Sequence, residues 1–263
     1  MHFAINHNVA PKQSLGEFFG MAKALGLSEV EIRNDISGAP IQDGTLPEAV
    51  KAAAEKAGVR IITINALYPF NVWSPALERK ANDLADYAAA CGAQALVMCP
   101  LNEGASVEFD DLVAALRAIK PILEARSLTG FVEPLGFSIS SLRTKAEAVR
   151  AIDAASGGET YKLVHDTFHH RVAGEQQFFP GRTGLVHISG VTDPRLAFEH
   201  MLDAHRVLVD AEDRLGNVEQ IKRLTAEGYA GPFSFEPFSP KVQGLADPGT
   251  ALRESMSFIR QRA

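Results

Sequence analysis

Short apolar segments alternate with amphipathic segments along almost the whole chain of 263 residues. Eight apolar runs read as strands, at residues 3–10, 29–35, 60–69, 95–101, 128–136, 161–170, 185–191 and 232–238. Apolar residues at helical spacing predict helices at residues 14–27, 46–58, 75–93, 109–127, 144–155, 217–229 and 247–262. Strands that alternate with helices in this way predict a parallel sheet with helices packed outside it.

Eight such units favour an α/β fold of the (β/α)8 barrel type, a TIM barrel, in which residues 1–263 form a single domain. A doubly wound open sheet is the competing architecture. The barrel is preferred because no strand is followed by GxGxxG or GxxxxGK[ST], the phosphate-binding loops of common open-sheet nucleotide binders. The stretch RVAGEQQFFPGRTG, residues 171–184, is expected to be a loop or at most a short helix.

Charge and cysteine content favour small-molecule chemistry in a reducing compartment. The formal net charge is -6 and no basic block occurs, so a nucleic acid is not the expected partner. Cys91 and Cys99 form neither a CxxC pair nor a zinc-finger pattern, which is consistent with a cytoplasmic protein. The first residues do not resemble a signal peptide, and the apolar runs are shorter than the roughly 20 residues that span a bilayer. No membrane role is predicted.

Four polar residues stand where four consecutive predicted strands end. They are Glu133, Asp166, His187 and Glu236, on the fifth to eighth strands. In a barrel of this type the active site lies at the C-terminal ends of the strands. Neighbouring strands lie about 4.8 Å apart, so these side chains can meet at one point. Three carboxylates and one imidazole there predict a divalent-cation site.

Each of these residues also has an ordinary structural interpretation. A single carboxylate at a strand end is most often a solvated loop residue or a helix N-cap, and a single histidine is most often a hydrogen-bonded core residue. The occurrence of all four residues at the ends of consecutive strands favours a metal site, because carboxylates this close repel one another without a cation. A cation also explains why Glu133 and Glu236 each end a buried apolar run.

The segments FVEPLGF, VHDTFHH, VHISG and FSFEPF resemble the sugar phosphate isomerase/epimerase-like barrels, the xylose isomerase-like family. This family includes tagatose/psicose epimerases, hydroxypyruvate isomerases, inosose isomerases and endonuclease IV. The likeness covers nearly the whole chain, and DTFHH with the later DAHRVLVDAEDRLGNVE is most similar to the inosose isomerases. The resemblance implies one divalent ion, Mn²⁺ first and Co²⁺, Mg²⁺ or Zn²⁺ as alternatives, held by Glu133, Asp166, His187 and Glu236.

By this resemblance, the expected reaction moves a proton next to a carbonyl of a ketose or keto-inositol through a metal-bound enediolate. Glu133 and Glu236 lie on strands separated by two others, so they can flank a substrate as general base and acid, in an order that stays open. His169 and Arg206 are the expected substrate ligands, with Arg195 as a competitor for the role of Arg206. The resemblance implies a homo-oligomer, a dimer or a tetramer, as the assembly to test, and a sugar or keto-inositol as the only other partner.

Two other functions remain open. A metal-dependent hydrolase of the endonuclease IV type needs further metal ligands, and the ends of the third and fourth strands carry no histidine. A non-catalytic sugar-binding barrel would keep the pocket without the chemistry. Aromatic residues after the third and sixth strands are expected either to cover the substrate or to pack in the core; they are Tyr68, Phe70, Trp73, Phe178 and Phe179.

Overall fold

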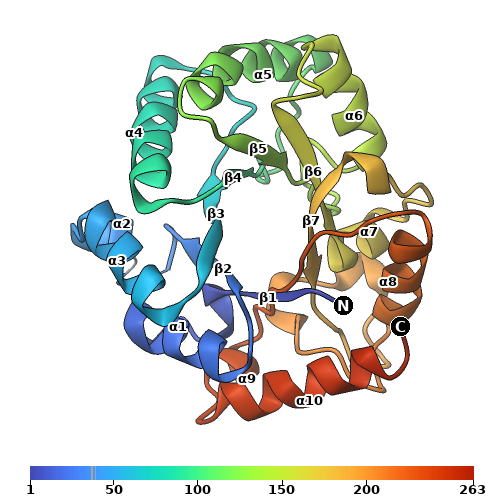
Figure 1. Cartoon of the computed structure of the whole chain (residues 1–263). Helices are drawn as coiled ribbons and strands as arrows, with labels where there is room; N and C mark the ends of the chain where they lie inside the picture. The colour runs from blue at the N-terminus through green and yellow to red at the C-terminus, as the bar shows by residue number, and fades with distance from the viewer. Residues whose placement is uncertain (37, 39) are drawn as a thin grey trace.

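Eight parallel strands follow one another around a closed barrel, in which β8 is hydrogen-bonded back to β1 (Figure 1). This computed structural model describes residues 1–36, 38 and 40–263. The strands are β1 Phe3–Asn6, β2 Glu29–Arg33, β3 Arg60–Leu67, β4 Ala95–Met98, β5 Thr129–Val132, β6 Tyr161–Asp166, β7 Thr183–Ile188 and β8 Phe233–Phe235. The predicted barrel is confirmed, and an open sheet is ruled out.

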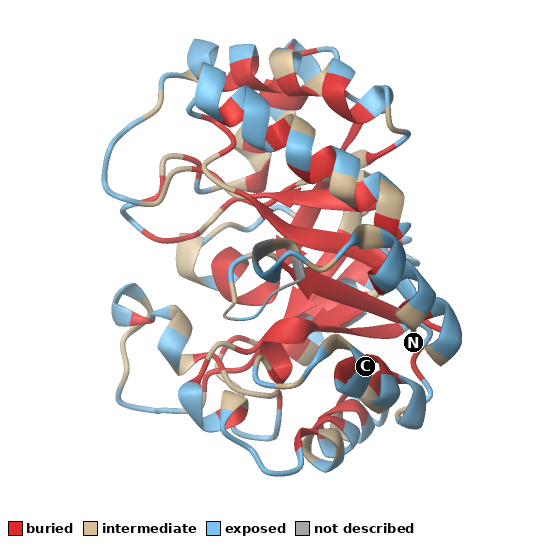
Figure 2. Cartoon of the chain, turned by 90° about the vertical axis from the view of Figure 1, so that its left-hand side faces the viewer, coloured by how far each residue is buried: buried red, intermediate tan, exposed pale blue. Residues whose placement is uncertain are grey.

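Helices surround the barrel, and the long ones bury one face each, as the red and blue sides of the helices in Figure 2 show. They are α1 Leu15–Ala24, α2 Pro40–Asp43, α3 Pro47–Ala57, α4 Pro75–Cys91, α5 Phe109–Glu124, α6 Lys145–Ala154, α7 Thr167–Ala173, α8 Asn217–Ala226, α9 Pro240–Gln243 and α10 Pro248–Arg260. A large apolar core fills the space between this ring and the strands.

The segment after the sixth strand differs from the sequence prediction. The strand predicted for residues 161–170 ends at Asp166, and α7 begins at Thr167, so the short helix starts four residues before the stretch in which a loop or short helix was expected. The reason is a cap: one carboxylate oxygen of Asp166 accepts hydrogen bonds from the backbone N–H groups of Phe168 and His169, at 2.7 and 3.0 Å. Because Asp166 is both the last residue of β6 and the cap of α7, no loop residue separates strand from helix in the sequence.

The inside of the barrel holds a small apolar cluster beneath a polar layer. The cluster contains Ala4, Ile62, Val97, Val164 and Leu185, with Phe131 packed against it. Successive side chains of a strand point to opposite faces, so residues two positions further along point inward as well. The inward positions that follow the cluster are Asn6, Cys99, Glu133, Asp166 and His187.

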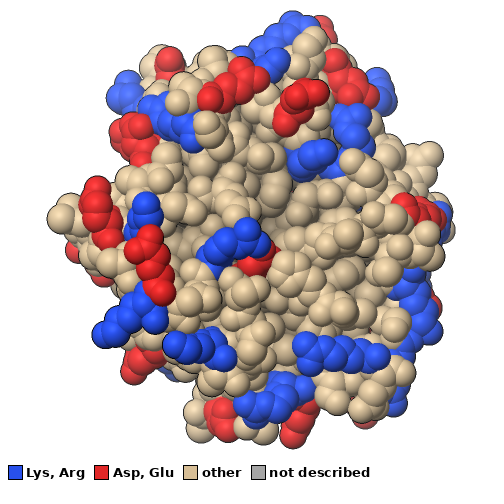
Figure 3. All heavy atoms as spheres, in the orientation of Figure 1, with Lys and Arg blue, Asp and Glu red and all other residues tan. Residues whose placement is uncertain are grey.

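Both termini lie at one end of the barrel, where the strands begin (Figures 1 and 2). Figure 3 shows this end, with Lys and Arg side chains interspersed with Asp and Glu around its rim. The carboxyl ends of the strands, and with them the predicted site, lie at the opposite end. No helix in the described part of the chain is both long and apolar enough to cross a bilayer.

A buried ion pair fastens α6 to the segment after α7. Lys145 Nζ lies 2.6 Å from Glu175 Oε2. The Glu175 carboxylate also accepts hydrogen bonds from the backbone N–H groups of Lys145 and Ala146, at 3.1 and 2.9 Å, which are groups that a helix leaves unpaired in its first turn. Burial acts to raise the pKa of Glu175, but hydrogen bonding with His170 and the charge of Lys145 outweigh it and lower the pKa to about 2.

Replacing Glu175 by Gln should remove stability that depends on pH. The folded-state pKa of Glu175 is about 2, against an ordinary value of 4.5, so its contribution is present above about pH 4.5 and is lost as the pH falls toward 2. We expect the free energy of unfolding of E175Q, measured with urea, to be lower than that of the wild type at pH 7. The difference should shrink as the pH approaches 3. An exposed control, Glu159→Gln, should have the same free energy of unfolding as the wild type at every pH. A difference between E175Q and the wild type that does not change with pH would contradict this account.

Candidate metal centre

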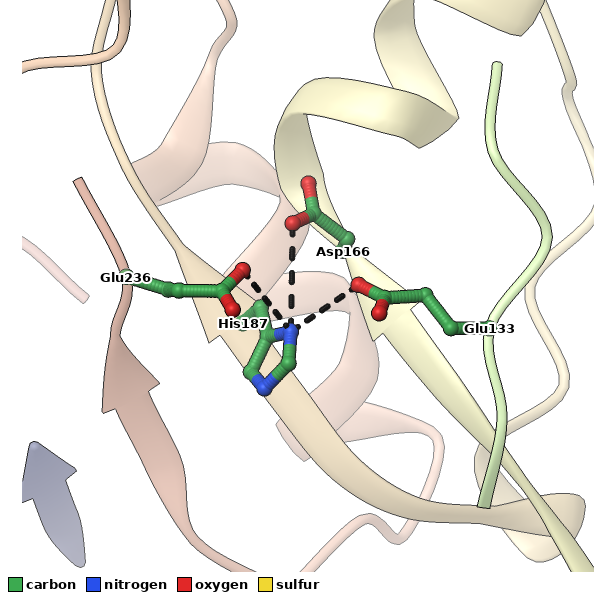
Figure 4. A group of neighbouring side chains, drawn as sticks. All are labelled: Glu133, Asp166, His187 and Glu236. Carbon is green, nitrogen blue, oxygen red and sulfur yellow. Dashed lines mark hydrogen bonds and ion pairs between the residues drawn. The ribbon is translucent and has the colours of Figure 1, made fainter. Parts of the chain in front are cut away.

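The four predicted residues Glu133, Asp166, His187 and Glu236 come together at the carboxyl ends of β5 to β8. Each offers one ligand atom, and these atoms all lie within 4.8 Å of one another. Figure 4 shows the three carboxylates pointing at one nitrogen of the imidazole. From His187 Nδ1, Glu133 Oε1 lies at 3.0 Å, Glu236 Oε2 at 3.2 Å and Asp166 Oδ2 at 4.0 Å. All four residues are buried.

Strand pairing brings these residues into register. Asp166, the last residue of β6, lies opposite His187 on β7, and His187 lies opposite Ser234 on β8. Glu236 follows two residues after Ser234, on the same inner face of the barrel. Glu133 directly follows β5. Each carboxylate therefore points inward because the residue two positions earlier does so, which is Phe131 for Glu133, Val164 for Asp166 and Ser234 for Glu236.

The charges of the cluster change its protonation strongly. Burial acts to lower the pKa of His187, but the surrounding carboxylates Glu236, Glu31 and Glu133 raise it well above its usual value. Burial acts to raise the pKa of Glu236, whereas the positive charges of His187 and Arg206 hold it far below its usual range. Without a further cation, the imidazolium and the arginines compensate the carboxylates.

Glu31, in the middle of β2, is a fourth buried carboxylate at the site, and the sequence analysis missed it. His187 Nε2 donates a hydrogen bond to Glu31 Oε2 at 3.1 Å. Thr63 and Asn65 on β3 donate to the same oxygen, at 2.6 and 3.3 Å, and the hydroxyl of Ser234 donates to the other. Since a carboxylate accepts hydrogen bonds, this contact keeps a proton on Nε2 and leaves Nδ1 to face the three other carboxylates.

Arg33, at the end of β2, is a second residue of the site that the sequence analysis missed. It is 5% exposed, and its Nη1 lies 2.7 Å from Glu236 Oε1. Asn6 Nδ2 donates to the same oxygen at 3.3 Å. Asp35 binds the other side of the guanidinium through both oxygens, each at 2.7 Å. The sequence EVEIR, residues 29–33, alternates charged and apolar residues. In a barrel this pattern places Glu31 and Arg33 on the inner face, so it could have indicated both residues.

Arg206 lies at the site, as the sequence analysis expected. It is 1% exposed, and its Nη2 lies 2.6 Å from Asp166 Oδ2 and 3.1 Å from Glu236 Oε2. Asp203 holds Nη1 at 3.1 Å and Ser189 accepts from Nε at 2.9 Å. Glu236 is therefore held by an arginine on each of its two oxygens. Whether Arg206 also binds substrate stays a prediction.

His169 lies in the first turn of α7 rather than in the strand predicted for residues 161–170. Its Nδ1 accepts a hydrogen bond from the backbone N–H of Gly136 at 3.2 Å, and its ring meets Phe137 edge-on at 5.0 Å between centroids. Gly136 has no room for a side chain, because a Cβ would lie 2.2 Å from the carbonyl oxygen of His169. The close approach fixes the imidazole against Gly136 and Phe137, and its expected contact with substrate stays a prediction.

Several residues near the site in sequence lie away from the cluster. Arg195 has a 91% exposed side chain and pairs with Asp193. His165 points out of the barrel, where its Nε2 bonds the Gln220 side chain at 2.9 Å. Phe178 stacks on His165 at 5.1 Å between centroids, so a covering role over the substrate is wrong for this residue.

The donor set fits a divalent cation. Buried oxygen donors with one imidazole nitrogen suit ions such as Mg²⁺, Mn²⁺ and Zn²⁺. The hydrogen bond from His187 to Glu31 is the outer contact that metal-binding histidines usually make. The residues that could hold an ion are Glu133, Asp166, His187 and Glu236.

A cavity of about 820 Å³ adjoins the cluster on the side of β2 to β4. Arg33 and Cys99 line it, and each contacts one of the two glutamates: Arg33 binds Glu236, and Cys99 Sγ lies 3.4 Å from Glu133 Oε2. Of the aromatic residues considered as a covering wall, Tyr68 lines this cavity, whereas Phe70 is fully buried in the core. The cavity is thus separated from the two glutamates by Arg33 and Cys99, which contact them.

Comparison with known proteins identifies the family. Residues 19–262 match the family described as xylose isomerase-like TIM barrel. The crystal structure of a xylose isomerase domain containing protein from Salmonella typhimurium LT2 is 35% identical, with a TM-score of 0.93 over 99% of this chain and 97% of that one. No curated protein matches the sequence.

Two more distant structures share the fold. The IOLI protein with a bound zinc atom is 17% identical, with a TM-score of 0.87 over 100% of this chain and 99% of that one. A D-allulose 3-epimerase from Methylomonas sp., in complex with D-allulose, is 16% identical, with a TM-score of 0.76 over 100% and 97% of the two chains. From the match over residues 19–262 and the 35% identical structure, the chain belongs to the xylose isomerase-like TIM barrel family.

Proposed function

We propose that this protein is a divalent-metal-dependent isomerase or epimerase of a ketose or keto-inositol, which moves a proton on the carbon next to the carbonyl. The observation that carries the proposal is the convergence of three carboxylates and His187 Nδ1 at the mouth of the barrel. Fold neighbours that include a D-allulose 3-epimerase and a D-psicose 3-epimerase support this reaction class.

Charge balance supports a doubly charged ion. Four buried carboxylates surround the site, those of Glu31, Glu133, Asp166 and Glu236, and the buried arginines Arg33 and Arg206 offset two of their charges. With His187 neutral, a divalent cation would offset the other two. We propose Mn²⁺, with Co²⁺, Mg²⁺ or Zn²⁺ as alternatives; the IOLI structure holds zinc. When bound, the ion would stabilise negative charge on substrate oxygens next to the reacting carbon.

Glu133 and Glu236 are the proposed acid and base. Their carboxylates approach His187 Nδ1 from opposite sides of the cluster (Figure 4), so each can face one side of a substrate between them. One takes the proton from carbon and the other returns a proton, and the stereochemistry of the substrate decides the order. Arg33 and Arg206 hold the two oxygens of Glu236 in place.

His169 and Arg206 are the proposed substrate ligands. Arg206 already reaches two of the proposed metal-binding carboxylates, so a substrate oxygen at the cluster comes within range of its guanidinium. His169 is fixed through Nδ1 by the backbone of Gly136, which leaves Nε2 for another partner. Both residues would orient the substrate rather than exchange protons with carbon.

Removal of divalent metal should abolish the activity. We expect EDTA-treated protein to be inactive toward a panel of ketoses and inososes, and Mn²⁺ to restore turnover. Solvent deuterium should enter the product, because the proton that returns to carbon comes from a group in exchange with water. Product analysis by NMR in D₂O measures both results. Full activity of the metal-free protein would refute the proposal, and two or three bound ions per chain would favour a hydrolase.

Glu133→Gln and Glu236→Gln should each lower turnover by about 100-fold or more, because an amide keeps the shape of the side chain but cannot accept the proton. The number of Mn²⁺ ions bound per chain, measured by mass spectrometry, separates lost chemistry from lost metal. Turnover that survives both substitutions would refute the acid and base roles.

Glu31→Gln should weaken Mn²⁺ binding about 10- to 100-fold, since it removes the carboxylate that holds His187 in the tautomer with Nδ1 free. Calorimetric titration of the metal-free protein measures this directly, without a substrate. The matched control is Glu29→Gln, a buried carboxylate on the same strand that pairs with Arg60 and His2 at the opposite end of the barrel. Equal affinities for the two variants would contradict the role of Glu31.

A further inference from the structure

The cavity of about 820 Å³ extends away from the cluster along one face of α4. The residues of α4 that line it are Ala76, Arg79, Lys80, Asp83, Leu84 and Tyr87, whose spacing of three and four places them on one side of a helix. The opposite wall comes from the ends of β2, β3 and β4 and from Ile41 on α2. A ligand can therefore extend from Arg33 and Cys99, beside the cluster, over about three turns of α4.

Most polar groups in the wall of this cavity already have partners within the protein. At the inner end, Arg33 is held by Asp35 and Glu236. Asn34 exchanges two hydrogen bonds with the backbone of Ala66, at 2.7 and 3.1 Å. These groups offer little hydrogen-bonding capacity to a ligand.

The two tyrosines and Lys80, further out, are engaged in the same way. The hydroxyl of Tyr87 donates to the carbonyl of Thr45 at 2.8 Å, and that of Tyr68 donates to Glu103 at 3.0 Å. Lys80 Nζ donates to the carbonyl of Tyr68 at 2.8 Å. With both hydroxyls occupied, the tyrosines present ring surface to the cavity, beside the apolar side chains of Ala66, Ala76, Leu84 and Ile41.

A bare sugar does not suit such a wall. Each buried hydroxyl that finds no partner costs about 1–3 kcal/mol, and among the described lining residues only the exposed Arg79 and Asp83 have no hydrogen bond or ion pair. The volume also lies in the upper part of the range of about 300–1,000 Å³ that ligands of drug size occupy. The wall matches a flat apolar group instead.

We propose that this cavity binds an apolar, planar substituent of the substrate, so that the protein acts on a keto sugar or keto-inositol that carries an aromatic group. The inference that the substrate is a keto sugar or keto-inositol rests on the proposed function. The inference that an aromatic group binds rests on the cavity alone. The sugar portion would occupy the metal centre, and the ring would lie between Tyr68, Tyr87 and Leu84.

Calorimetry with two glycosides of one sugar tests the cavity. We expect 4-nitrophenyl β-D-glucopyranoside to bind the Mn²⁺-loaded protein at least about tenfold more tightly than methyl β-D-glucopyranoside, because the aromatic ring leaves water for apolar wall. Equal affinity for the two glycosides, or no binding of the nitrophenyl glycoside, would overturn the proposal.

The variant Ala76→Trp places a large side chain in the cavity at a position that contacts neither glutamate, and Ala76→Ser is its matched control. A76W should lose the preference for the aromatic glycoside and keep the affinity for the methyl glycoside, while A76S should behave as the wild type. A preference that persists in A76W would place the aromatic group elsewhere and overturn the assignment.

The two proposals fail in different ways. If no ketose or inosose exchanges deuterium in the presence of Mn²⁺, the proposed isomerase reaction is wrong, but a preference for the aromatic glycoside that A76W removes still supports the subsite. If isomerisation occurs with bare ketoses and the preference is absent, the reaction stands and the subsite is wrong.

Discussion

Compensation of buried negative charge is the constraint on which the site depends. Glu31, Glu133, Asp166 and Glu236 lie within the barrel mouth with almost no exposure to water, where uncompensated carboxylates would cost several kcal/mol each. Arginines reach them from two directions, and an imidazole stands at their centre. The same charges that make a cation favourable also raise the pKa of His187, so proton and metal would compete for Nδ1.

The barrel produces this arrangement because every second side chain along a strand points to its inside. Small apolar residues such as Val164 and Leu185 fill the lower part of the interior, and two positions later the same strands present Asp166 and His187. Apolar packing below thus fixes the direction of the polar side chains above. The hydrogen bonds of Glu31 to β3, β7 and β8 tie the polar layer across the barrel, which leaves the imidazole little freedom to turn.

The sequence was sufficient to predict the barrel and the four converging residues, because both follow from local alternation and from the place where each strand ends. The prediction missed Glu31 and Arg33, because it considered only residues at strand ends. The alternation in β2 turns both residues inward, but their contacts with His187, Ser234 and Glu236 form only when the barrel closes. The start of α7 was also missed, because the same carboxylate of Asp166 both ends a strand and caps a helix.

Arg33 connects the cavity to the carboxylate cluster. Its guanidinium binds Glu236 at one edge and Asp35 at the other, and it forms part of the wall along which a ligand would extend toward α4. A group that fills the cavity would therefore contact Arg33, which orients Glu236, one of the two proposed proton carriers. Because binding energy far from the reacting carbon can be used to position catalytic groups, a substituent in this cavity would raise turnover as well as affinity. A bare ketose, which leaves the cavity to water, would have neither advantage.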